Sequence, residues 1–234
     1  MRRHLVLPTL LLAAIAAAPA SAKTFGANLS KKPNSTATCG NSFPFAQGVT
    51  SCMGYSISPS SYAPTTGVVT KVRVRTGNFR QGPMQIVVLR SFYQNNLGDP
   101  GHPNFFCCFV QRYGPKFTPR RNRITAVSTA LGMVVQPAPP PNDGNTVAKD
   151  DFLALSVLAP NVPFPLRRVS TGYAAFHAPS PRPGDTPAPS PGPIGNSQGA
   201  FNGLVIMMSA ELDPANKRRS AGWAAPLRAW TSTW

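Results

Sequence analysis

The chain has 234 residues, of which 27 are Pro, 19 are Gly and 42% are apolar. This apolar content is sufficient for a core and excludes a wholly disordered chain, whereas the many Pro and Gly residues exclude a fold built on long helices. With 23 basic against 7 acidic residues, the formal net charge is +16. Such a charge predicts attraction to polyanions, and a single glutamate, Glu211, leaves few carboxylates for acid–base chemistry.

Residues 1–22 have the pattern of a secretory signal peptide. Arg2 and Arg3 form a basic start, residues 5–18 an apolar stretch, and Ala20-Ser21-Ala22 a small-residue cleavage site. The apolar stretch is shorter than the about 20 residues that a membrane-spanning helix needs. The sequence therefore predicts a secreted protein, extracellular or held in the cell envelope.

Four cysteines are candidates for disulfide bonds, which export into an oxidising compartment favours. Cys39 and Cys52 flank a segment rich in Gly, Pro, Ser and Asn that a disulfide could close. Cys107 and Cys108 are adjacent, and in a strand they would point to opposite faces. Three complete pairings stay open. No C-x-x-C spacing occurs, so the sequence predicts no zinc site.

The predicted domain organisation has three parts after the signal. Residues 23–65 are polar and turn-rich and are expected to pack on the sandwich as an N-terminal segment. Residues 66–211 carry strand-like runs between turns, which indicate an all-β, antiparallel β-sandwich, with a Pro-rich loop over 178–199. Residues 212–234 form a basic tail. The expected strands cover 68–75, 84–89, 105–112, 123–129, 131–135, 151–158, 172–176 and 201–208.

Several segments of the sandwich region share a pattern with known proteins. They are residues 67–77 (GVVTKVRVRTG), 82–90 (GPMQIVVLR) and 150–156 (DDFLALS), with Cys107-Cys108 and Phe117-Thr118-Pro119. On these segments, roughly residues 66–210 resemble an uncharacterised family of secreted bacterial β-sandwich proteins with a jelly-roll-like organisation. The resemblance implies a fold and an extracellular location, and it implies no activity.

Two groups of residues are candidates for binding. In residues 68–75, Val72 and Val74 alternate with basic residues, which predicts a half-buried strand with a cationic outer face. Arg80, Arg90 and the cluster Arg120, Arg121 and Arg123 could extend that face. The tail combines basic residues with tryptophans and could contact a membrane surface or stack on sugars. The proposed binding residues are Lys71, Arg73, Arg75, Arg218, Arg219, Trp223 and Trp230.

Catalytic and metal-binding interpretations have less support. A glycosidase would need Glu211 to face a second carboxylate from Asp150, Asp151 or Asp213. Calcium could be bound by the Asp150–Asp151 pair with Asp143 and Asn145, although no EF-hand spacing is present. Serine hydrolysis would depend on His102 or His177, and the chain has no G-x-S-x-G motif.

These patterns predict a non-catalytic binding or adhesion module of the cell envelope, with a polysaccharide or an anionic wall polymer as its ligand. No cofactor and no nucleic-acid partner is expected. One alternative is an extracellular hydrolase that uses Glu211 with an aspartate. The other is a purely structural surface protein.

Overall fold

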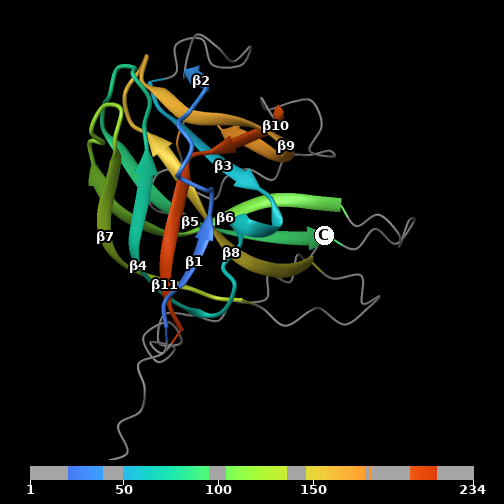
Figure 1. The fold of residues 1–234 in the computed structure, drawn as a ribbon. Coiled ribbons are helices and arrows are strands. Elements are labelled where there is room, and N and C mark those ends of the chain that lie inside the picture. The colour runs from blue at the N-terminus through green and yellow to red at the C-terminus, as the bar shows by residue number, and fades with distance from the viewer. Residues whose placement is uncertain are drawn as a thin grey trace, which may run out of the picture.

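The structure is a computed structural model, and it describes residues 21–38, 50–94, 104–135, 146–177, 180 and 201–214. Within these ranges the chain forms two antiparallel sheets and one short 3-10 turn, η1 (Pro59–Ser61) (Figure 1). No helix in this part of the chain is long and apolar enough to cross a membrane.

The two sheets contain four and seven strands. The four-stranded sheet has the order β1 (Lys23–Gly26), β11 (Met208–Asp213), β4 (Gly67–Arg75) and β7 (Ile124–Met133). The seven-stranded sheet has the order β10 (Phe201–Ile206), β9 (Pro163–His177), β3 (Cys52–Ile57), β8 (Thr146–Val157), β5 (Met84–Gln94) and β6 (Asn104–Phe117), and β2 (Ser35–Thr38) also pairs with β9.

The connectivity confirms the predicted jelly-roll-like sandwich. Apart from β2, β9 and β10, the strand orders are β1-β11-β4-β7 and β3-β8-β5-β6. Numbered along the chain, these eight strands lie as 1-8-3-6 and 2-7-4-5, which is the interleaved double Greek key of a jelly roll. Strands β9, β10 and β2 widen the second sheet beyond β3.

The main core lies between the two sheets. Val72 and Val74 of β4 belong to the same core cluster as Ile86 and Val88 of β5, and none of these side chains is exposed. The basic residues that alternate with the valines remain half-exposed on the outer face, as the alternation predicts. Burial of such apolar side chains contributes about 1.5–3 kcal/mol each.

The N-terminal segment is a part of the sandwich, which corrects its description as a turn-rich segment packed on it. Residues 23–65 supply β1, β2 and β3, and β3 is a central strand between β8 and β9. Strand β3 has no continuous apolar run, since Gly54 and Ser56 interrupt it. A Cβ atom at Gly54 would lie 2.8 Å from the ring of Phe176, so the ring occupies the space of a side chain.

Other strand boundaries also differ from the sequence prediction. The two runs at 123–135 form the single strand β7, and the run at 201–208 divides into β10 and β11 at Met207. Residues 1–20 of the predicted signal peptide, residues 181–200 of the Pro-rich loop and the tail from 215 lie outside the described residues.

Gly26 at the end of β1 has a backbone conformation that requires glycine. Its φ is +99°, and a Cβ atom would lie 2.5 Å from the carbonyl oxygen of Met208. We expect Gly26→Ala to lower the free energy of unfolding by about 1–3 kcal/mol, because alanine tolerates neither the φ nor the backbone contact. Thr24→Ala, at an exposed position of the same strand, should change it by less than about 0.5 kcal/mol. Urea unfolding of the two variants measures this difference.

Candidate polyanion-binding surface

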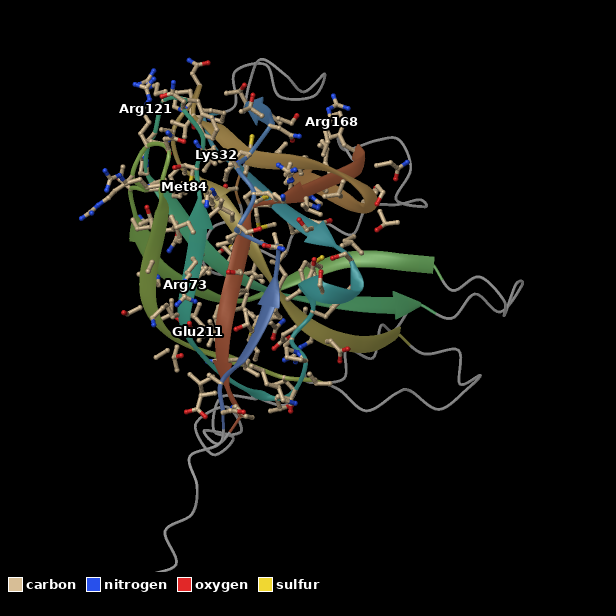
Figure 2. All side chains as sticks on the ribbon, in the orientation of Figure 1. Lys32, Arg73, Met84, Arg121, Arg168 and Glu211 are labelled. Atoms are coloured by element: carbon tan, nitrogen blue, oxygen red, sulfur yellow. The ribbon has the colours of Figure 1, made fainter. Side chains whose placement is uncertain are left out.

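One end of the sandwich carries a concentration of cationic side chains, which we call the basic end. They come from the segment after β1, the β4–β5 loop, the end of β6, the β6–β7 loop and the middle of β9. All but Arg167 are exposed, and Arg167 is half-buried. In Figure 2, the labelled Arg121, Lys32 and Arg168 all lie at this end. The basic end consists of Lys31, Lys32, Arg80, Lys116, Arg120, Arg121, Arg123, Arg167 and Arg168.

The β4–β5 and β6–β7 loops of the basic end are held together by Thr76. This residue is fully buried; its hydroxyl donates to the carbonyl oxygens of Arg120 and Arg123, and its backbone N–H donates to Arg123 at 3.0 Å. A further backbone hydrogen bond of 2.9 Å joins Asn122 to Gly77. The arginine backbones are therefore fixed while their side chains remain exposed to solvent.

Two arginines connect the other segments to this end. Arg75, the last residue of β4, donates from Nη1 to the carbonyl oxygen of Leu29 at 2.8 Å. Arg167 of β9 donates from Nη1 to the carbonyl oxygen of Lys32 at 2.6 Å. These bonds place Lys31 and Lys32 between the end of β4 and the middle of β9, so that cations from distant parts of the sequence share one end of the fold.

The acidic side chains that the structure describes lie away from the basic end. Asp213 is opposite Val68, near the start of β4, and Glu211 is opposite Lys71. In β8, Asp151 is opposite Arg90 of β5, and Asp150 precedes it. Arg90 is six residues from Met84, the residue of β5 that lies closest to the basic end. Within the described residues, the basic end therefore has an uncompensated positive charge.

The predicted cationic stripe on β4 lies on the outer face of the four-stranded sheet, where it is partly neutralised. Glu211 of β11 forms two ion pairs with this stripe. Its Oε2 lies 3.2 Å from Lys71 Nζ, and its Oε1 lies 2.5 Å from Arg73 Nη1. Hydrogen bonds from Arg73 and then Lys71 lower the pKa of the Glu211 carboxyl. Figure 2 shows Arg73 and Glu211 on this sheet, away from Arg121. The stripe thus offers less net charge than the basic end.

The same geometry weakens the proposed pairing of Glu211 with Asp151. A general acid must hold a proton at the working pH, whereas two cations favour the ionised form of Glu211. Asp151 belongs to the other sheet and is 1% exposed, and Arg90 donates to both of its carboxylate oxygens, at 2.7 and 3.1 Å. These two carboxylates do not face each other.

The proposed calcium ligand Asp151 already has protein partners, which would compete with a calcium ion. Besides Arg90, the backbone N–H of Val134 donates to Asp151 Oδ2 at 2.7 Å, so both oxygens already accept hydrogen bonds. Burial is the largest influence on the pKa of Asp151 and raises it, while Arg90 and Val134 oppose this shift. The described residues contain no cluster of three His, Cys, Asp or Glu side chains that could hold a metal ion, and Asp143 and Asn145 lie outside them.

His177 has a hydroxyl neighbour that sequence reasoning did not identify. Its Nε2 lies 3.0 Å from the Tyr55 hydroxyl oxygen, and the two rings stack with their centroids 5.5 Å apart. Tyr55 belongs to a second apolar cluster formed by β3, β5, β6, β8 and β9, where Phe152 packs against it. Burial lowers the pKa of His177 to about 4 and raises that of Tyr55. The pair is neutral near pH 7.

Several sequence-predicted residues lie where the structure does not describe them. Arg218, Arg219, Trp223 and Trp230 of the tail, Cys39 and His102 lie outside the described residues, and so does the side chain of Cys107. Neither Cys52 nor Cys108 is a free thiol. The disulfide pairing and the role of the tail stay predictions.

Comparison of the chain with protein-family models, with curated proteins and with solved structures found no match in any of the three.

Proposed function

We propose that this protein is a binding module of the cell envelope that attaches to an anionic polymer through its basic end. The observation that supports this function best is the gathering of nine basic side chains from separate segments on one end, with the described acidic side chains elsewhere. Exposed cations that carry no carboxylate partners leave their charge available to an external polyanion.

The arrangement favours a linear polymer over a small anion. Each exposed cation gains little alone, because solvent and salt screen single surface charges. Several cations that are held in fixed positions can contact one polymer at the same time. Each contact releases counterions from the polymer, which favours binding. A wall polymer or an acidic polysaccharide provides repeated charges of this kind, and the predicted export would bring the protein to it.

The basic end predicts salt-sensitive binding that depends on the β6–β7 loop. We expect the chain to bind a polyuronate and a poly(glycerol phosphate) but not neutral dextran. The triple variant Arg120→Gln, Arg121→Gln, Arg123→Gln should weaken binding at low salt by tenfold or more. The slope of log K against log salt should fall by roughly one for each lost contact. Biolayer interferometry across a salt series measures both quantities.

The tail supplies a control with the same change in charge. Lys217→Gln, Arg218→Gln, Arg219→Gln also removes three charges, so binding through net charge alone would weaken equally in both variants. Equal losses would contradict a role for the basic end, and loss only in the tail variant would assign binding to the tail. Absence of binding to any polyanion at low salt would leave the structural or hydrolase alternative. Turnover of a polymer that Glu211→Gln abolishes would support the hydrolase.

A further inference from the structure

An open groove lies beside β1, at the edge of the four-stranded sheet. It has a volume of about 560 Å³ and runs between residues 24–28 and the segment that follows η1. Figure 1 shows β1 beside the turn after β3, and the two elements are in contact. A narrower recess of about 30 Å³ continues from the groove towards the core and shares Phe25, Gly26, Ala27 and Ser60 with it. The groove is within the size range of small-molecule sites.

The lining of the groove combines an aromatic ring with hydroxyl, amide and carboxylate groups. Tyr62 contributes the ring, which packs edge-on against Phe152 with centroids 5.5 Å apart. The polar side chains come from Thr24, Asn28, Ser60 and Asp150. Among the described residues that line the groove and the recess there is no lysine or arginine, in contrast to the basic end.

The hydroxyl groups are held in a fixed arrangement by η1. Ser58 Oγ lies 3.0 Å from Ser60 Oγ and 2.8 Å from Ser61 Oγ, and all three residues line the recess. Ser56 Oγ accepts a hydrogen bond of 2.7 Å from the backbone N–H of Ile206, which connects this wall to β10. Ala63 N–H donates to the carbonyl oxygen of Asp151 at 3.0 Å and fixes the other end of the segment.

This combination points to a ligand that is rich in hydroxyl groups and uncharged. A tyrosine ring offers apolar surface to C–H groups, whereas serine, asparagine and aspartate side chains provide the donors and acceptors that sugar hydroxyls require. None of the described lining residues carries a cation that would hold an anionic ligand, which favours an uncharged one. We propose that the groove beside β1 binds a neutral oligosaccharide segment. This site goes beyond the proposed function and is independent of the basic end.

The test uses defined neutral sugars as probes. The purified chain is titrated by calorimetry with hexasaccharides of β-1,4-linked glucose, α-1,4-linked glucose and β-1,4-linked N-acetylglucosamine. We expect at least one of them to bind. Ser60→Trp, which fills the groove from an exposed position, should abolish that binding, and Ser170→Trp on the exposed face of β9 should leave it unchanged. Tyr62→Ala should weaken it by about tenfold, and Tyr62→Phe by less than about threefold.

The outcomes separate this site from the basic end. Binding that persists in Ser60→Trp would overturn the proposal, and so would a failure of all three sugars to bind. The arginine triple variant should keep its sugar affinity while losing polyanion affinity, and Ser60→Trp should show the converse. Either proposal can therefore fail while the other stands. Because Ser60 is exposed and its variant adds rather than removes a side chain, loss of folding is not the expected cause of lost binding.

Discussion

Arg90→Met should lower the free energy of unfolding by about 3–5 kcal/mol, because it leaves the buried carboxylate of Asp151 without the cation that hydrogen-bonds to it. Arg90 is 8% exposed and Asp151 is 1% exposed, so solvent cannot replace the lost partner. The pair is bidentate, with Nε to Oδ1 at 2.7 Å and Nη2 to Oδ2 at 3.1 Å. Chemical denaturation at pH 7 measures the loss.

The double variant Arg90→Met, Asp151→Asn is the control for this explanation. Asparagine keeps an oxygen that can accept the Val134 N–H but carries no charge. If the cost of Arg90→Met arises from a buried unpaired charge, the double variant should recover most of the lost stability. If the double variant is as unstable as the single one, the methionine itself disrupts packing and the electrostatic explanation is wrong.

The Arg90–Asp151 pair also connects the core to the groove. Asp151 accepts a hydrogen bond from Ala63 in the groove wall, and its own backbone N–H donates to Val134 after β7. Its neighbour Asp150 lines the groove. A buried ion pair gives little net stability compared with an apolar pair of the same shape, so its more specific contribution is to fix the position of these segments.

The strands with a clear period of two or a continuous apolar run could be predicted from the sequence. Val72 and Val74 alternate with basic residues, and β4 has the predicted faces. Residues 152–157 of β8 are apolar almost without interruption because both faces of this central strand are covered. In both strands, the local sequence is enough to predict which residues are buried.

Strand β3 could not be predicted, because its burial depends on residues far away in the sequence. Gly54 is covered by Phe176, and Tyr55 is paired with His177, which lies 122 positions away. The groove has the same origin, since it forms only where residues 24–28 meet residues 60–64. Composition predicts attraction to a polyanion, but only the fold brings Lys31 and Lys32 to the same end of the sandwich as the arginines of the β6–β7 loop.

The buried Tyr55–His177 pair predicts a loss of stability in mild acid. The ordinary pKa of histidine is 6.5, and burial lowers the pKa of His177 in the folded chain to about 4. Between these values the unfolded chain binds a proton that the folded chain does not, so lowering the pH favours unfolding. The stability contribution is fully present above about pH 6.5, and its loss reaches about 2 kcal/mol at pH 5 and about 3 kcal/mol at pH 4.

His177→Gln isolates this contribution, because glutamine can still hydrogen-bond to the Tyr55 hydroxyl but does not titrate. The variant should be less stable than the parent chain at pH 7, and the difference should shrink or reverse by pH 4. Urea unfolding at a series of pH values for both proteins gives the two curves. Parallel curves would mean that His177 is protonated as easily in the folded chain as in the unfolded one. The pKa of Glu211 is lowered and that of Asp151 is raised in both proteins, so the difference between the two curves reports on His177.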